Sequence, residues 1–203
     1  MAGCESVNTV VLLDLLQLYE KELCSKIFSF KLSNGQVIKL RFFREQLCHL
    51  LGIQHIYENN KKYLGASGYE KILTGKITVP ALKKHNKSEY AKIKERLEHF
   101  DEIPELLMKG SLIRFYQERA NPKTKIRAEI CIFHEKQTYM LHLFLSKEGL
   151  TDGYAPTSFV IKFCNDDAYR QFMKNQLSEL LLNYDNVGAI WFDGEWGHDS
   201  DPA

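Results

Sequence analysis

The sequence predicts an α+β protein with a mostly antiparallel β-sheet, helices on one face of that sheet, and a C-terminal helix-strand appendage. Helical spacing of apolar residues near the N-terminus and apolar–polar alternation in several short segments are two reasons. The third reason is charge: residues 1–165 hold 25 Lys+Arg and 18 Asp+Glu, whereas residues 166–203 hold 2 and 8. We therefore predict a basic domain over 1–165 and an appended, incomplete segment over 166–203.

The composition is that of an ordinary globular chain, with 203 residues, of which 44% are hydrophobic and 26% charged. No stretch reaches the roughly 18–20 uninterrupted apolar residues of a membrane span, so a membrane partner is not expected. The five cysteines are odd in number and lack CxxC spacing, which argues against a disulfide framework and a zinc site. We expect a cytoplasmic protein with no metal and no other cofactor.

The N-terminal elements follow from local pattern. Apolar residues at helical spacing predict a helix over residues 7–24. Lys26–Leu32 and Val37–Phe43 both alternate, and the turn residues Ser33-Asn34-Gly35 separate them. This pattern predicts a β-hairpin.

A short helix should follow over Arg44–Leu51 and end at Gly52, with His49 near its C-terminus. Residues 57–110 are rich in lysine and interrupted by glycine and proline, and they predict several polar helices.

Four more strands complete the predicted sheet, over Leu112–Glu118, Arg127–Glu135, Tyr139–Leu145 and, after Pro156, Ser158–Phe163. Helices followed by a run of strands are typical of an α+β domain. The appendage should contain a helix, Asp167–Asn183, and a strand, Val187–Phe192.

Residues 10–165 resemble a phage-encoded, nuclease-like family. The family belongs to the group named after barnase, EndoU, colicin nucleases and RelE, and the resemblance is to its fourth phage subgroup. The likeness rests on the strand Val37–Phe42, the segment Leu47–Ile53 with its HLLG sequence, and Pro156-Thr157-Ser158-Phe159. It implies an RNA-cleaving toxin or effector of phage or mobile-element origin.

Metal-independent RNA cleavage needs an acid, a base and a cation for the charge on phosphorus. His49 is the leading acid or base candidate, because imidazole titrates near neutral pH. Arg41 or Lys136 would stabilise the phosphate, and Thr157 or Ser158 would position it. A histidine at a helix C-terminus is also explained by the helix dipole alone.

Three other residues on the predicted strands stay open as contributors: His134, His142 and Arg114. For each of them, an edge or solvated position on the sheet is the favoured interpretation.

The densest basic segment is a candidate RNA-binding surface. It contains Lys83, Lys84 and Lys87, with Tyr90 as a residue that could stack on a base. Interleaved glutamates make an ordinary solvated helix face the competing interpretation.

Residues 169–198 resemble a fragment of an α-L-fucosidase, through a FMxxQLxELLxNY helix and a GAIWFDGxW strand. The resemblance implies that Asp193 occupies the nucleophile position at the end of a barrel strand. A complete barrel takes about 250 residues, and a retaining glycosidase needs a second carboxyl group, so activity on fucosides is not expected from this fragment.

Three functions therefore compete. The first is a metal-independent ribonuclease that acts on RNA, with an antitoxin or host protein as a possible partner. The second is a non-catalytic module that binds RNA or protein. The third is a truncated fucosidase without a complete site.

Overall fold

The computed structural model describes residues 11–32, 35–116, 125–149 and 153–163. All of them lie in one compact unit, which ends at Phe163. The predicted appendage helix and strand, and Asp193 with them, lie outside the described residues.

The helices form a nearly continuous series before the main strands. The predicted first helix is confirmed from Leu12 onward, as α1 (Leu12–Leu18) and the π-helical segment η1 (Tyr19–Cys24). The later helical elements are η2 (Arg44–Gln46), α2 (Leu47–Leu50), α3 (Ile53–Ile56), η3 (Lys61–Tyr63), α4 (Gly65–Leu73), α5 (Val79–His85), α6 (Lys87–Glu98), η4 (Phe100–Glu102) and α7 (Ile103–Lys109).

Side-chain caps explain where the polar helices begin. The Thr78 hydroxyl accepts a hydrogen bond from the backbone N–H of Ala81 at 3.3 Å, at the start of α5. The Asn86 side chain accepts from the backbone N–H of Glu89 at 3.1 Å, at the start of α6. Both caps satisfy backbone donors that the first turn of a helix leaves unpaired, and the Asn86 cap separates α6 from α5.

The sheet has six strands, in the order β1-β2-β6-β5-β4-β3. All neighbours are antiparallel except β2 and β6, which are parallel. The predicted α+β class with a mostly antiparallel sheet is thus confirmed. The strands are β1 (Ile27–Lys31), β2 (Val37–Arg41), β3 (Ser111–Arg114), β4 (Ile130–Glu135), β5 (Tyr139–Lys147) and β6 (Gly153–Phe163).

The last strand differs from its prediction at one end. β6 begins at Gly153, five residues before the predicted start at Ser158, and Pro156 lies inside it. Pro156 is tolerated because it sits where the β5–β6 register shifts, between the pairs of Phe144 and Leu145. A proline has no N–H to donate, so it fits a strand at such an irregularity.

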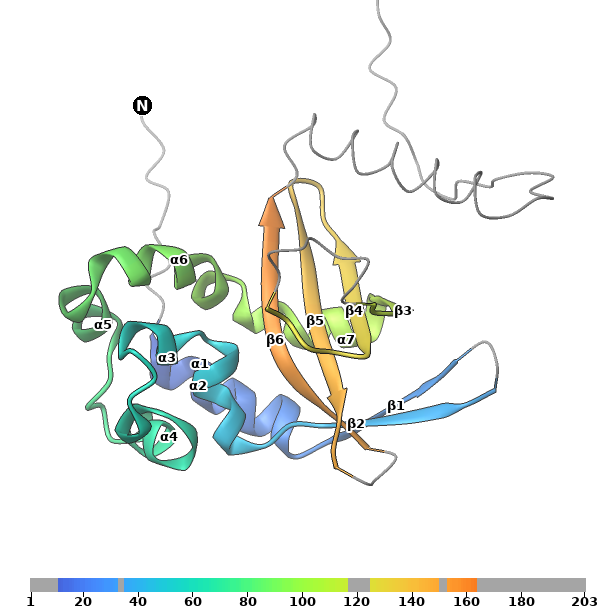
Figure 1. Cartoon of the computed structure of the whole chain (residues 1–203), viewed down its shortest axis with the longest axis horizontal. Helices are drawn as coiled ribbons and strands as arrows, with labels where there is room; N and C mark the ends of the chain where they lie inside the picture. Colours follow the sequence, from blue (N-terminus) through green and yellow to red (C-terminus); the bar gives the residue numbers. More distant parts are fainter. Residues whose placement is uncertain (1–10, 33–34, 117–124, 150–152, 164–203) are drawn as a thin grey trace, which may run out of the picture. The chain divides into compact units, whose positions relative to one another are not determined.

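One face of the sheet and the helices share the hydrophobic core. Three fully buried aromatic side chains connect the two layers: Phe100 lies 6.0 Å from Tyr19 and 6.0 Å from Phe159, measured between ring centroids. Helices α2 and α6 contact β6, whereas α7 crosses behind the sheet and contacts β4 (Figure 1). The helices therefore cover one face of the sheet.

Candidate active site

The residues around His49 line a cavity of about 400 Å³ between the helices and β6. Contributions come from α2, α3 and α6, from the segment before β4, and from the middle of β6. The lining residues are His49, Gln54, His55, Arg96, Lys125, Ile126, Arg127, Thr157 and Ser158.

A glycine turn places two histidines at this cavity. His49 lies in the single turn of α2, and Gly52, with a φ of 78°, ends that turn and begins α3. A side chain at Gly52 would put its Cβ 2.7 Å from Cγ2 of Ile93 and 3.1 Å from Nη1 of Arg96. Only glycine combines this left-handed conformation with such close packing on α6.

The buried side chain of Gln54 lies between the two imidazoles. Its Nε2 is 2.8 Å from Nδ1 of His49 and 3.5 Å from Nε2 of His55. Its Oε1 is buried and has no hydrogen-bond partner among the described residues. Because an amide can present either a donor or an acceptor at the same place, Gln54 suits both a neutral and a protonated His49.

Arg96 brings a positive charge to the same cavity. Burial lowers the pKa of the guanidinium, which nevertheless stays protonated at neutral pH. The pKa of His55 is lowered first by the partial desolvation of its imidazole, and then by the charges of Arg96 and His49. His55 is therefore favoured in its neutral form, which can accept a proton.

We expect the Arg96→Gln variant to raise the pKa of His55, since one of the charges that disfavour the imidazolium is removed. An NMR titration of the imidazole C–H signals measures this shift. Lys94→Gln is the matched control, because it removes one charge from the same helix but lies outside the cavity lining. An unchanged His55 pKa in Arg96→Gln would contradict the electrostatic coupling.

The other wall of the cavity comes from β6 and the segment before β4. The Thr157 hydroxyl donates to the carbonyl of Phe144 at 3.2 Å, and the Ser146 hydroxyl donates to the carbonyl of Arg127 at 3.0 Å. Lys125 and Arg127 are exposed. No carboxylate is among the described residues that line this cavity, so its cations favour an anionic ligand.

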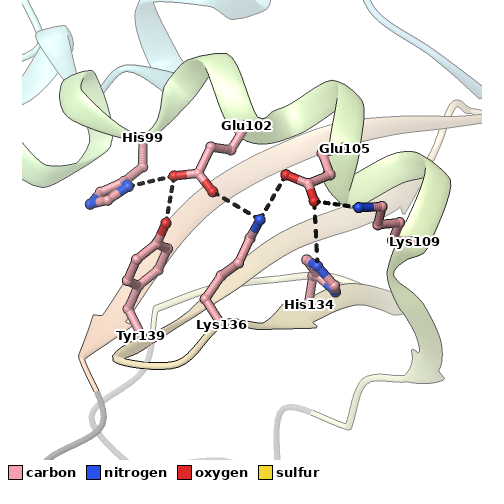
Figure 2. Close-up of polar contacts among 7 residues, drawn as sticks. All are labelled: His99, Glu102, Glu105, Lys109, His134, Lys136 and Tyr139. Carbon is pink, nitrogen blue, oxygen red and sulfur yellow. Dashed lines mark hydrogen bonds and ion pairs between the residues drawn. The ribbon is translucent and has the colours of Figure 1, made fainter.

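The structure thus brings His49 together with Thr157 and Ser158, but it places the two predicted phosphate-stabilising residues elsewhere. Arg41 is exposed at the end of β2. Lys136 lies in the turn between β4 and β5, within a second polar cluster (Figure 2). Neither residue lines the His49 cavity.

The second polar cluster joins α7 and its flanking residues to the β4–β5 hairpin. Lys136 donates to Glu105 at 2.7 Å and lies 3.4 Å from Glu102, while Tyr139 donates to Glu102 at 2.8 Å. His99 bonds the same Glu102 oxygen at 2.6 Å, and its ring lies beside that of Tyr139, with centroids 4.4 Å apart (Figure 2). Since the ammonium of Lys136 is held between two carboxylates, it is engaged in this contact and is not available to a phosphate.

This cluster should make stability depend on acidic pH. Hydrogen bonds from Lys136 and Lys109 lower the pKa of Glu105 to about 2. The unfolded-state pKa is higher, about 4.3, so the stabilisation is complete above that pH and is lost as the pH falls toward about 2. We expect the thermal unfolding midpoint to fall over this window, and to fall less steeply in Glu105→Gln, as measured by circular dichroism.

Glu98→Gln is the control for that experiment, because it removes an exposed carboxylate that pairs with Lys94 at 3.4 Å. The role assigned to Glu105 is wrong if the two variants show the same pH dependence.

The remaining candidates are dispersed. Nε2 of His134 lies 4.0 Å from Glu105, in the second cluster, and His142 is on β5 with its pKa lowered by burial. Arg114 is exposed at the end of β3. In α5 and α6, three predicted RNA-binding residues, Lys83, Lys84 and Lys87, are exposed, whereas Tyr90 packs against the core.

Several residues of the cavity were not predicted as site residues. The sequence pattern assigned no role to Gln54, His55, Arg96 or Arg127. The short interval from His49 to His55 is a signal in the sequence, because a glycine between them permits a reversal of the chain direction.

No group of three or more His, Cys, Asp or Glu side chains suited to a metal ion occurs in the described part of the chain. In that part, too, no helix is both long and apolar enough to cross a bilayer.

This small α+β domain has two imidazoles that can act as acid and base, and cations that can stabilise a phosphate, at one cavity. This combination is typical of a nuclease-like protein. Comparison with known families agrees: the model described as phage-Barnase-EndoU-ColicinE5/D-RelE like nuclease4 matches residues 11–183. This chain belongs to that family of phage nuclease-like domains. Neither the curated proteins nor the solved structures gave a match.

The predicted resemblance of residues 169–198 to an α-L-fucosidase has no support from the comparisons. The nuclease-family match runs past residue 165 to residue 183, so it includes residues 169–183, the part of the fucosidase-like segment that was predicted to be helical. A short amphipathic helix of common residue types is a weak basis for such an assignment, since many unrelated folds need the same pattern. Asp193 lies beyond the family match.

Proposed function

We propose that this protein is a metal-independent endoribonuclease that acts as a toxin or effector of phage or mobile-element origin. One observation carries the proposal: His49 and His55 converge with Arg96 and two further cations on a single cavity. Membership of a phage nuclease-like family supports the chemical class.

In the proposed reaction, neutral His55 takes the proton from the ribose 2′-OH, and the resulting oxygen attacks the adjacent phosphorus. His49 gives a proton to the departing 5′-oxygen. The bond from phosphorus to that oxygen breaks, which leaves a 2′,3′-cyclic phosphate and a free 5′-hydroxyl. The reaction consumes no cofactor, because one proton is removed and one is supplied.

The cations stabilise the charge that grows on the phosphate oxygens. Arg96 is the most buried of the three cationic side chains, so its field is the least weakened by water. Arg127 and Lys125 are exposed at the rim and suit the attraction of the RNA backbone. Gln54 keeps both imidazoles in place while their protonation changes.

The proposed site of action is the cytoplasm, where the substrate RNA is found. The free thiols of Cys24, Cys48 and Cys131 are compatible with a reducing compartment. Lys83, Lys84 and Lys87 take part in no ion pair within the described residues, and they remain proposed contacts for RNA or for an antitoxin protein.

The test is to incubate the purified full-length protein with single-stranded RNA in EDTA and to analyse the product ends by mass spectrometry. Cyclic-phosphate ends that form in EDTA are the expected result. Products that form only after Mg²⁺ is added would overturn metal independence. Salt-sensitive RNA binding without any product would favour the non-catalytic module instead.

A further inference from the structure

A second and larger cavity lies at the N-terminal end of β6, whereas the candidate active site lies at the middle of that strand. It has a volume of about 1050 Å³. Its walls come from the end of β1 and the residues before β2, from β3 and the two residues after it, and from the adjoining ends of β4, β5 and β6. We call this cavity the edge groove, because β1 and β3 are the two opposite edges of the sheet and both line it.

Positive charge surrounds the edge groove. Lys31, Arg114 and Lys147 line it, all three are exposed, and none forms an ion pair within the described residues. A single carboxylate, Glu129, is among the described lining residues, and it accepts a hydrogen bond from the hydroxyl of Tyr154 at 3.4 Å. The excess of cations predicts an anionic occupant.

Aromatic and aliphatic side chains form the rest of the lining. Phe115 packs edge-on against Phe144, with ring centroids 5.0 Å apart, and Tyr116 beside it is 42% exposed. Ile113, also in the lining, is 50% exposed. Flat apolar surfaces that alternate with cations are the combination that binds single-stranded nucleic acid, since bases stack while phosphates pair with the charges.

The edge groove and the candidate active site are adjacent along two segments of chain. Arg127 lines the active site and Glu129 lines the groove, two residues later. On β6, Tyr154 lines the groove and Thr157 lines the active site, a separation of roughly 10 Å along an extended strand. One polynucleotide can therefore occupy both cavities.

We infer that the edge groove is a binding site for the single-stranded RNA that flanks the cleaved phosphate. This inference rests on the proposed ribonuclease function and extends it, because it assigns the substrate class as single-stranded RNA longer than a dinucleotide. The groove contributes affinity, and the His49 cavity contributes the chemistry.

Binding can be measured apart from cleavage. The full-length protein is titrated against a fluorescent single-stranded 2′-O-methyl RNA of about 12 nucleotides, which lacks the attacking hydroxyl, at several salt concentrations. Anisotropy gives the Kd at each salt concentration. The variant Lys31→Gln/Arg114→Gln/Lys147→Gln should weaken binding at least tenfold and lower the salt slope by about 2, at about 0.7 per phosphate contact.

The matched control is Lys61→Gln/Lys62→Gln/Lys76→Gln, which removes the same charge from exposed positions outside both cavities. This control variant should raise the Kd for the single-stranded RNA by a smaller factor than the groove variant does. Equal losses in the two variants would overturn the inference, as would equal affinity for single- and double-stranded RNA. A second variant, Tyr116→Ser, should weaken binding by about fivefold or more through lost stacking, and unchanged affinity would also count against the groove.

The two proposals can fail separately. Groove-dependent binding with no cleavage of natural RNA would leave the groove assigned and reject the ribonuclease. Cleavage by the groove variant with an unchanged KM for long RNA would keep the ribonuclease and reject the groove. A groove variant that loses binding of a protein partner, but not of RNA, would reject RNA as the occupant.

Discussion

Replacement of His49 by alanine is expected to lower the rate of RNA cleavage by about 10²–10⁴-fold, the usual contribution of a general acid or base. His55→Ala should have a comparable effect, because the two imidazoles serve the same transition state. The double variant should lose much less than the product of the two single effects, since residues that act as a unit are not additive. Single-turnover cleavage of a labelled RNA measures all three rates.

His134→Asn is the control for the histidine variants, because it removes an imidazole that lies outside the cavity. The unmodified protein should show a bell-shaped dependence of kcat/KM on pH. Each single histidine variant should lose either the rise at low pH or the fall at high pH. Full activity in His49→Ala would remove His49 from the mechanism. Similar losses in His134→Asn would place the chemistry elsewhere.

Replacement of Gly52 by alanine is expected to destabilise the protein by about 2–5 kcal/mol. A left-handed conformation costs a residue with a side chain about 1–2 kcal/mol, and overpacking adds about 1–3 kcal/mol. The overpacking arises because the new Cβ would lie 2.7 Å from Cγ2 of Ile93. Urea denaturation measured at equilibrium gives the change in unfolding free energy.

Gly75→Ala separates the two contributions to that loss. Gly75 has a similar φ of 69°, but no atom lies within 4 Å of the position of its Cβ. It should therefore lose only the conformational part, about 1–2 kcal/mol. Equal destabilisation in the two variants would show that close packing between Gly52 and α6 contributes nothing.

Gly52 also connects stability to the proposed chemistry. The same added Cβ would lie 3.1 Å from Nη1 of Arg96, so the guanidinium must move. The loss of cleavage by Gly52→Ala, measured where the variant is still folded, should thus exceed that of Gly75→Ala.

Much of the local structure could be predicted from the sequence. The alternating pattern around Ser33-Asn34-Gly35 predicts the β1–β2 hairpin, and Gly52 ends α2 where a C-terminal glycine signal predicts it. These features depend on backbone conformations and side-chain periodicities that extend over a few residues. For the same reason, the helical region before β3 and the two strands on either side of Lys136 were predicted correctly.

The site depends on contacts that no local pattern encodes. His49 and Ser158 are far apart in the chain, and they meet because β6 packs on α2 and α6 and pairs in parallel with β2. Lys136 has the residue type of a phosphate ligand, but its ion pairs with α7 engage it elsewhere. Residue type, composition and spacing could not reveal that difference.

The sequence by itself therefore determined the α+β class, most of the elements and His49 as a candidate acid or base. Only the tertiary structure decided that Gln54, His55 and Arg96 accompany His49 at the cavity that Thr157 and Ser158 also line. The physical reason is the range of the interactions. Secondary structure is largely fixed by neighbours in sequence, whereas a cavity is shaped by the packing of elements that meet only after the chain has folded.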